Sequence, residues 1–327
     1  MDNLKPIKSA DIRKHCNDFL ILKRATGLKY RSEERHLQHF ARFCEERYPN
    51  AVIPEDVLAI WLSSDSNQSL KTKNNKVSLI KSFAQYMFSL GYTPLKIPLI
   101  RYTRNTKFIP HIFTEEEMTA IWTTVDNIQP LKRLPNVTRC LPALFRLLYS
   151  CGLRISEALA LEVGDVDFSS KTITVRHTKL ERERLIPMSD SLTEVLKQYA
   201  NECTADLPKN APFFYYHKGV RLTQHTIYGR FRKILKDSGI PYKGKDRGPR
   251  LHDLRHTFSV NAMNKLVDEG KDIYAALPIL SAFLGHSSVE STERYVRLTE
   301  DRLSGITECV SLTMPTLFPE VKANGEI

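Results

Sequence analysis

The chain has 327 residues, of which 42% are hydrophobic and 26% are charged, and its formal net charge is +11 at pH 7. This length suits two domains of ordinary size, each with its own core. No apolar run approaches the roughly 20 residues that span a membrane, and the charged start lacks the apolar core of a signal peptide. We therefore expect a cytoplasmic protein.

The positive charge is concentrated in the first third of the chain. Residues 1–110 carry 19 Lys and Arg against 10 Asp and Glu, whereas residues 111–327 carry 29 against 27. A basic segment of this kind indicates a polyanionic partner, and nucleic acid is the leading candidate. A solvated basic surface without a partner is the alternative that charge alone leaves open.

The same part of the chain predicts a helical domain over residues 1–105. Apolar residues recur at helical spacing over 9–26, 32–48, a stretch that opens at Pro54, and 69–90. Pro54 suits the first turn of a helix. Gly27 and Gly91 follow the first and last stretches, as glycines commonly follow helix ends.

Basic residues lie on the last of these predicted helices and continue in a predicted linker. Four lysines lie on or near the polar side of this helix: Lys71, Lys73, Lys76 and Lys81. They either keep this face solvated or grip the phosphates of a nucleic acid. Residues 93–110 then hold three prolines and show no regular period, and we place the linker between the domains at 106–112. Three residues of this segment are further candidates for phosphate contacts: Arg101, Arg104 and Lys107.

A second domain is predicted over residues 113–327. It begins with a capping box, in which Thr114 precedes a helix and Glu117 stands three residues later. Two alternating stretches within residues 172–188 predict a β-hairpin. Helices are expected over 190–203, 223–238, 251–267, 271–284 and 288–298.

The cysteine pattern predicts no metal site. The six cysteines are scattered, with no CxxC pair and no histidines at zinc spacing. They are typical of reduced, mostly buried thiols in a cytosolic protein. The sequence also has no Walker-type loop and no acidic metal cluster, so we expect neither a metal nor another cofactor.

Two separated pieces of the second domain carry candidate cations. In GLRISE, residues 152–157, Arg154 opens a helix, where free N–H groups also favour a phosphate. Taken alone, this motif is better explained by a surface pair between Arg154 and Glu157. Lys179 lies at the tip of the predicted hairpin, where it is either exposed to solvent or a proton donor on a movable loop.

Two further pieces carry histidines and a tyrosine. In HDLRH, His252, Arg255 and His256 share one face of a helix. Burying two imidazoles and a guanidinium together is costly without an anion, which favours an oxyanion site over a metal site. In LGHSSVESTERYVRL, Gly285 permits a tight turn before His286, and Tyr295 follows nine residues later. By itself this tyrosine is typical of core packing.

Together the pieces resemble the tyrosine recombinases, also called the phage integrase family. GLRISE, the hairpin lysine, HDLRH, LGH and the tyrosine nine residues later stand in the order and approximate spacing of that family. The resemblance covers residues 112–300, and the helical N-terminal region is similar to the family's core-binding domain. It implies a mainly α fold, in which a four-helix, SAM-like domain precedes an α+β catalytic domain with a small β-hairpin.

The resemblance also implies roles in DNA strand cleavage. Arg154 and Arg255 would hold the non-bridging oxygens of the scissile phosphate. Tyr295 would attack phosphorus and form a 3′-phosphotyrosine, with His252 accepting its proton. Lys179 would protonate the leaving 5′-oxygen. Arg182 and Arg184 are basic residues close to Lys179 in the same hairpin.

Two supporting roles complete this set. His286 would donate a hydrogen bond to the transition-state oxyanion. Glu157 and His256 would support the residues that contact the phosphate.

The implied partner is double-stranded DNA with inverted-repeat core sites, bound by a tetramer. The tail, residues 299–327 with Leu303 and Ile306, would pack on a neighbouring protomer. Integration, excision or transposition of a mobile element is the expected role, with chromosome or plasmid dimer resolution as an alternative. A type IB topoisomerase and a non-catalytic DNA-binding regulator are the remaining alternatives.

Overall fold

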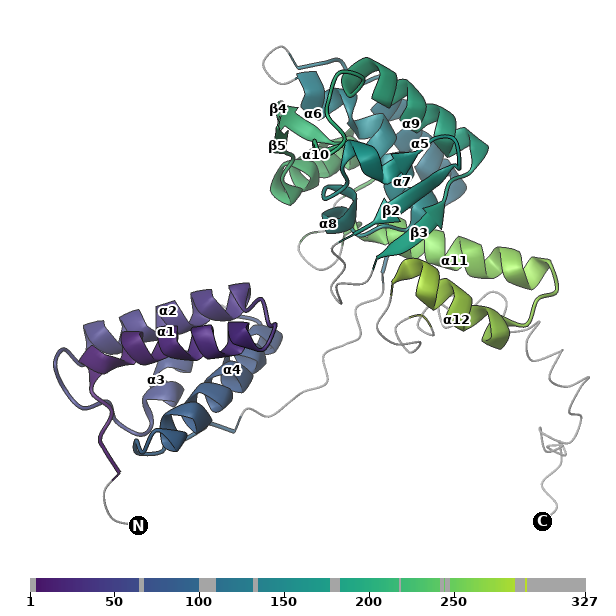
Figure 1. Cartoon of the computed structure of the whole chain (residues 1–327). Helices are drawn as coiled ribbons and strands as arrows, with labels where there is room; N and C mark the ends of the chain where they lie inside the picture. Colours follow the sequence, from purple (N-terminus) through teal and green to yellow (C-terminus); the bar gives the residue numbers. More distant parts are fainter. Residues whose placement is uncertain are drawn as a thin grey trace, which may run out of the picture. The chain divides into compact units, whose positions relative to one another are not determined.

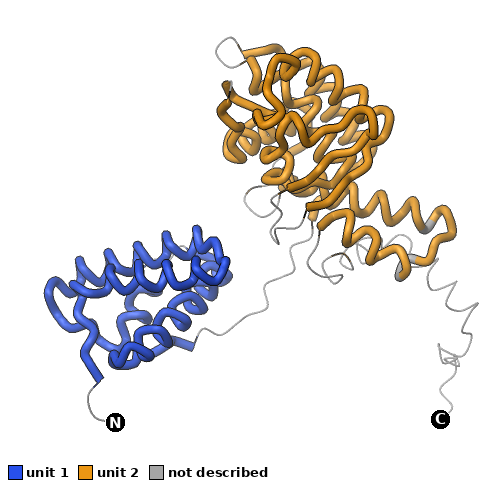
Figure 2. The backbone as a smooth tube through the Cα atoms, viewed as in Figure 1, with its two compact units in different colours: residues 1–107 blue, residues 108–327 orange. Residues whose placement is uncertain are grey.

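The computed structural model describes residues 4–64, 68–99, 110–131, 135–176, 183–217, 219–241, 244, 248–285 and 292. The chain divides into two compact units, residues 1–107 and 108–327 (Figure 2). Each unit has its own hydrophobic core. The fold is mainly helical, and the antiparallel sheets within the described residues belong to the second unit. In these described stretches, no helix is both long and apolar enough to cross a bilayer.

The first unit is a bundle of helices (Figure 1), and aromatic side chains contribute to its core. Its helices are α1 (Ser9–Ala25), α2 (Arg31–Arg47), α3 (Val57–Ser63) and α4 (Leu70–Ser89). Phe40 meets Trp61 edge to face at 5.1 Å between ring centroids, and Phe19 meets Phe83 at 5.5 Å. Such edge contacts add to the burial of large apolar surfaces. The four predicted helices are therefore present, held together by the apolar faces that predicted them.

One helix of this unit starts later than expected. The prediction opened a helix at Pro54, but α3 begins at Val57. The carbonyl of Pro54 accepts a hydrogen bond from the Val57 N–H at 3.1 Å, which closes a turn before the helix. The predicted ends after the first and fourth stretches are confirmed, because Gly27 and Gly91 adopt φ values of 83° and 82°.

Lys76 is not on the solvated face that the sequence predicted for it. Its side chain is 3% exposed, and its Nζ lies 4.7 Å from the centroid of the Trp61 ring. The face of an indole ring attracts a cation, and the aliphatic stem of lysine packs as apolar surface. Lys71 and Lys81 are exposed and Lys73 is half-buried. Lys76 is therefore corrected to a core residue, while the other three α4 lysines remain accessible.

The second unit is built around helix α7 (Figure 1). Its elements are α5 (Glu115–Asp126), α6 (Pro135–Arg139), α7 (Leu141–Cys151), α8 (Ile155–Ala158), β1 (Val166–Asp167), β2 (Thr172–Val175), β3 (Arg184–Pro187), α9 (Asp190–Cys203), β4 (Tyr215–His217), β5 (Val220–Arg221), α10 (Gln224–Asp237), α11 (Asp253–Asp268) and α12 (Ile273–Leu284). Leu144, Phe145 and Leu147 of α7 are fully buried. The capping box predicted at Thr114 and Glu117 is present at the start of α5.

The predicted hairpin is confirmed and belongs to an antiparallel sheet of order β1-β2-β3. Its register pairs Ile173 with Ile186, which face the core, and Val175 with Arg184. Arg184 is therefore the first residue of β3, at the hairpin end that leads to residues 177–182. Those residues include Lys179 and lie outside the described part of the chain. The second sheet, β4-β5, was not predicted, because strands of three and two residues are too short to show a period.

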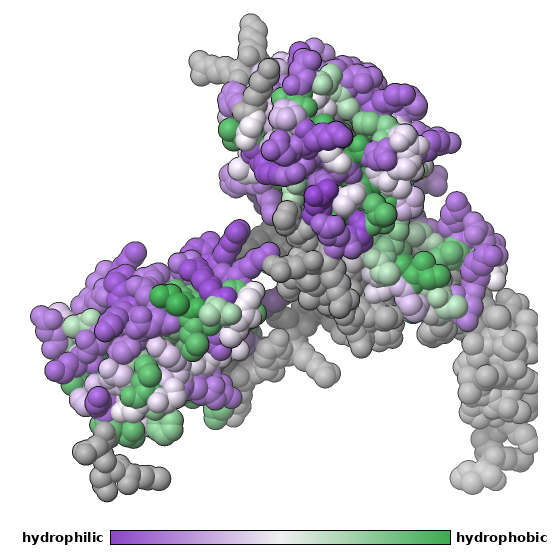
Figure 3. Space-filling model, in the orientation of Figure 1, coloured by the Kyte–Doolittle hydropathy of each residue, from purple (hydrophilic) through white to green (hydrophobic). Residues whose placement is uncertain are grey.

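Helix α12 packs on α11 through a small apolar cluster. Leu284, the last residue of α12, is fully buried together with Val260 and Met263 of α11. Figure 3 shows apolar side chains over the region of α11 and α12, where Ile279 is 73% exposed. The burial of Leu284 fixes the C-terminal end of α12 against the rest of the second unit.

Gly152 allows the turn after α7 to lie directly against α11 and α12. Its φ is +56°, and a Cβ there would come within 2.5 Å of Phe258 Cδ1 and 2.9 Å of Leu284 Cδ2. Both the backbone conformation and the close packing therefore require glycine at this position.

We expect Gly152→Ala to lower the free energy of unfolding by about 3 kcal/mol, combining left-handed strain with overpacking. Urea denaturation measures this change. Gly239→Ala is the matched control, because Gly239 has a φ of +74° and no described atom within 4 Å of its Cβ position. The control should lose only about 1 kcal/mol. Equal losses in the two variants would contradict the packing at Gly152.

Candidate active site

Three arginines from different elements converge on the C-terminal end of α12. Arg184 Nε donates to the carbonyl of Phe283 at 3.0 Å, and Arg255 Nη2 donates to that of Leu284 at 2.7 Å. Arg154 Nη2 donates to the carbonyl of Gly285 at 3.0 Å. The last carbonyls of a helix have no partner within the helix and carry partial negative charge. The helix end therefore draws the three guanidinium groups into one cluster.

Arg255 is the buried centre of this cluster. Its side chain is 2% exposed, and its Nη1 donates to the carbonyl of Gly152 at 2.7 Å. One guanidinium thus joins the turn after α7 to the end of α12. Because the guanidinium is buried, its charge acts in a medium of lower dielectric than water, where electrostatic interactions are stronger.

Arg154 is the more accessible arginine and is held by Glu157. Its side chain is 30% exposed, and its Nη1 donates to Glu157 Oε1 at 2.7 Å. The Arg154 backbone N–H also donates to Glu157 Oε2 at 3.0 Å. The carboxylate therefore satisfies this N–H before α8, and a phosphate near this helix end stays a prediction. A guanidinium has five N–H donors, so the side-chain bonds of Arg154 leave capacity for an anion.

Glu157 is a buried carboxylate between two arginines. It is 4% exposed, and Arg184 Nη2 donates to its Oε2 at 2.9 Å. Burial alone would raise the pKa of Glu157, but the hydrogen bonds and charges of Arg184 and Arg154 hold this pKa below its ordinary value. The pair with Arg154 that the sequence left as an alternative is therefore present, although it is not a surface pair.

His252 and His256 lie together at the start of α11, as predicted. Their rings meet edge to face with centroids 4.8 Å apart. His252 is itself exposed to solvent, but partial desolvation of its ring against the protein lowers its pKa to about 4, and nearby positive charge contributes. This charge comes from Arg255, Arg250 and Arg154. His252 is therefore neutral at pH 7, and two backbone carbonyls accept from Arg255, while the oxyanion site that the sequence suggested stays a prediction.

A pH dependence of stability follows from His252. Its ring is neutral in the folded chain down to about pH 4, whereas the unfolded ring binds a proton below its ordinary pKa of 6.5. The unfolded state therefore binds more protons between these values, and the free energy of unfolding should fall as the pH falls through this window. We expect His252→Gln to remove part of that fall, measured by urea denaturation at pH 7 and about pH 5. His225→Gln, at an exposed histidine of α10, is the control, and identical pH dependence in the two variants would contradict this account.

Several predicted residues lie outside the described part of the chain. They are Arg101, Arg104, Lys107, Lys179, His286 and Tyr295, together with the helix predicted over 288–298 and the tail. Gly285, which precedes His286, is described and has a φ of +65°, consistent with the predicted tight turn. The described part of the predicted site therefore consists of Arg154, Glu157, His252, Arg255 and His256.

Arg184 and Asp253 contribute to this site although their sequence contexts did not reveal it. Asp253 is fully buried and accepts a hydrogen bond from the Arg250 N–H at 2.8 Å, which fixes the chain around His252. Arg184 is the first residue of a strand, and its sequence context is typical of a solvent-facing hairpin residue. No local sequence signal points to Arg184, because the burial of Glu157, which explains the need for a second arginine, appears only in the structure.

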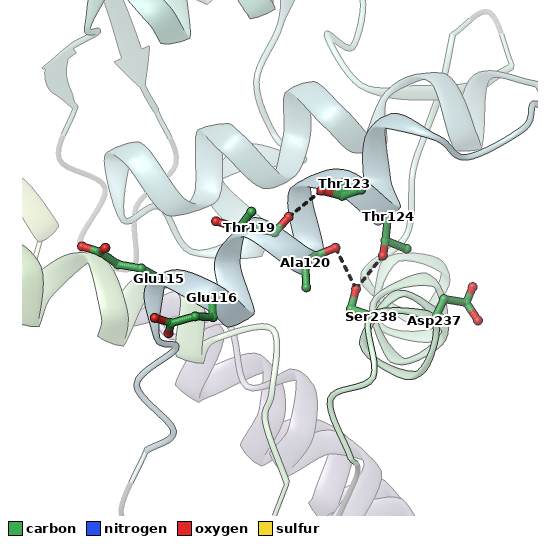
Figure 4. A pocket seen from close by; sticks show the side chains of 8 residues that line it. All are labelled: Glu115, Glu116, Thr119, Ala120, Thr123, Thr124, Asp237 and Ser238. Carbon is green, nitrogen blue, oxygen red and sulfur yellow. Dashed lines mark hydrogen bonds between the residues drawn. The ribbon is translucent and has the colours of Figure 1, made fainter.

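A separate surface hollow of about 670 Å³ lies between α5 and α10 (Figure 4). It is lined by Glu115, Glu116, Thr119, Ala120, Thr123, Thr124, Asp237 and Ser238. Its three acidic side chains would repel a phosphate, and none of the predicted site residues lines it. No group of three or more His, Cys, Asp or Glu residues is arranged to hold a metal ion in the parts of the chain that the structure describes.

Several known proteins are similar to this chain in sequence and in fold. The Phage integrase family model matches residues 111–302. The chain is 29% identical over 296 residues to the putative integrase/recombinase y4rB of Sinorhizobium fredii, covering 87% of this chain and 92% of the relative. It is 29% identical over 317 residues to the tyrosine recombinase XerC of Chlamydia caviae, covering 91% and 93%.

Two solved structures show the same fold. The XerH site-specific recombinase bound to its difH substrate has a TM-score of 0.63 at 24% identity, covering 90% of this chain and 83% of that chain. The Tn1549 transposon integrase in complex with circular intermediate DNA has a TM-score of 0.61 at 20% identity, covering 88% and 99%. This chain belongs to the phage integrase family, the tyrosine-type site-specific DNA recombinases, and is a DNA strand transferase that binds DNA.

Proposed function

We propose that this chain cleaves and rejoins DNA at specific paired sites, with Tyr295 as the nucleophile. The observation that carries the proposal is the convergence of Arg154 and Arg255 on neighbouring carbonyls, Gly285 and Leu284, at the end of α12. These two arginines stand far apart in the sequence, and the chain continues from this point to His286. A phosphate at this position would meet concentrated positive charge.

The two arginines would act differently on the phosphate. Arg154 is accessible and would bind the non-bridging oxygens directly, with donors in a planar fork. Arg255 would supply positive charge from its buried position, where low dielectric strengthens the attraction to the phosphate. Both effects grow as negative charge develops in the transition state, which is the condition for accelerating the reaction.

The chemical step would exchange one phosphoester for another. The bond from Tyr295 Oη to phosphorus forms and the bond from phosphorus to the 5′-oxygen breaks, leaving a 3′-phosphotyrosine and a free 5′-hydroxyl. His252, neutral at pH 7 because of its lowered pKa, accepts the tyrosine proton. Lys179 protonates the 5′-oxygen, and His286 donates to the oxyanion. Rejoining reverses these steps and needs no nucleotide, because the phosphotyrosine retains the energy of the original bond.

Arg184 is excluded as the hairpin residue that protonates the leaving 5′-oxygen. Its guanidinium is engaged by Glu157 and by the carbonyl of Phe283, and an arginine does not lose its proton in proteins. Lys179 therefore remains the candidate for this role.

The biological context that we propose is recombination between two inverted-repeat core sites held by four protomers. This rests on family membership, and on the relatives XerC and y4rB, which are a tyrosine recombinase and a putative integrase/recombinase. Recombination for a mobile element and dimer resolution both use this reaction. A topoisomerase would cleave and reseal a single duplex without exchanging strands.

A pool of randomised DNA duplexes bearing single nicks tests this function. Cleavage beside a nick releases a short 5′-hydroxyl strand, so the covalent adduct cannot reverse. Wild-type protein should form adducts that resist denaturant, and sequencing the trapped DNA should yield a preferred duplex. Two intact copies of this duplex should then exchange strands. No adduct would contradict the proposed function, and adducts without strand exchange would favour a topoisomerase.

A further inference from the structure

We infer that Arg184 is a positioning residue for strand cleavage, which holds Arg154 through Glu157 and fixes the end of α12. This inference rests on the proposed function. The observation behind it is that one guanidinium joins three elements: it lies on β3, pairs with the buried Glu157 of α8 and donates to the carbonyl of Phe283. Arg184 itself need not touch the DNA.

The first link runs through Glu157 to Arg154. Each oxygen of Glu157 accepts from both arginines: Oε1 from Arg154 Nη1 at 2.7 Å and Arg184 Nη1 at 3.3 Å, and Oε2 from the Arg154 N–H at 3.0 Å and Arg184 Nη2 at 2.9 Å. A carboxylate that accepts from two sides has its plane fixed. The position of the Arg154 guanidinium therefore depends on Arg184.

The second link runs to the end of α12. Arg184 Nε donates to Phe283, while a Cβ at Gly285 would lie only 2.7 Å from Arg184 Nη1. The guanidinium thus lies against the Gly285 backbone, whose carbonyl accepts from Arg154. Arg184 is 13% exposed, so water competes little for these contacts.

The geometry requires arginine and not merely a positive charge. Arg184 uses Nε on the helix carbonyl and both Nη atoms on the carboxylate, so its planar fork serves two elements at once. Lysine has a single Nζ and cannot reproduce this arrangement. Arg184→Lys therefore keeps the positive charge but loses the positioning contacts, so this variant distinguishes the two effects.

The test compares Arg184→Met, Arg184→Lys and wild type on the nicked duplex that wild type captures. Single-turnover adduct formation at saturating protein should fall about 100-fold in both variants, as misplacement by about 1 Å can cause. The Kd for the uncleaved duplex should stay unchanged, because a residue that only positions Arg154 does not bind the DNA. Arg146→Met is the matched control, since Arg146 also pairs bidentately with a carboxylate, Asp126, and should retain the wild-type rate.

A second variant distinguishes loss of positioning from loss of folding. Arg184→Met leaves Glu157 buried with less compensating charge, so the double change Arg184→Met/Glu157→Gln removes that charge. The double variant should melt close to wild type and still cleave slowly. In an Arg154→Lys background, Arg184→Met should cost less than in wild type, because both changes act on the same group.

The outcomes separate this inference from the proposed function. Wild type that forms no adduct contradicts the proposed function. Wild type that forms adducts while Arg184→Lys cleaves at the wild-type rate overturns the positioning role alone. Equal losses from Arg184→Met with and without Arg154→Lys would also overturn it, because Arg184 would then act independently of Arg154.

Discussion

Replacing Arg255 by methionine should cost both folding stability and cleavage. The change leaves the carbonyls of Gly152 and Leu284 buried without the guanidinium that binds them. We expect the free energy of unfolding to fall by about 3 kcal/mol, since each buried unsatisfied group costs about 1–3 kcal/mol. Cleavage should fall by roughly 10³-fold, the effect of removing one strong electrostatic contact to a transition state. Urea denaturation and single-turnover adduct formation measure the two losses.

Arg221 offers a control for this substitution. It also donates to backbone carbonyls, those of Leu159, Ala160 and Leu161, but its side chain is 40% exposed. Water can replace its bonds, so Arg221→Met should lose less than about 1 kcal/mol and keep its cleavage rate. If Arg255→Met cleaved as fast as Arg221→Met, Arg255 would have no role at the phosphate.

Tyr295→Phe should give the larger loss of activity, at least about 10⁴-fold, because it removes the atom that forms the covalent bond. A phenolic hydroxyl has an ordinary pKa of about 10 and attacks poorly at pH 7. The proposed site compensates by neutralising the phosphate and by placing an unprotonated His252 to accept the proton. Phenylalanine keeps the ring, so the Kd for the captured duplex should not change.

The matched control for this substitution is Tyr228→Phe, which removes a hydroxyl from an exposed tyrosine of α10. It should leave adduct formation at the wild-type level. Adducts from Tyr295→Phe at a rate near that of Tyr228→Phe would mean that another residue is the nucleophile.

Local patterns predicted most of the fold. The helix expected over 190–203 is α9 with the same bounds, because Ser189 caps it by accepting from the Leu192 N–H. The hairpin was predictable because its two strands alternate on either side of a polar connection. The second sheet, the late start of α3 and the burial of Lys76 were not predictable, because each depends on tertiary contacts that leave no periodic pattern.

The residues of the candidate site were likewise predictable only in part. Arg154, His252 and Arg255 were found because each stands in a short motif whose order along the chain is distinctive. Arg184 was not singled out, because its role depends on a carboxylate that lies 27 positions away in the sequence. The lowered pKa of His252 was equally hidden, since it arises from partial desolvation by the surrounding fold and from charges on several different segments.

The most direct test of the central claim is the chemical identity of the trapped residue. Wild-type adduct formed on the nicked duplex is digested with nuclease and protease, and the modified peptide is sequenced by mass spectrometry. We predict a nucleotide joined through its 3′-phosphate to Tyr295. A nucleotide on any other residue, or a 5′-phosphate linkage, would contradict the account.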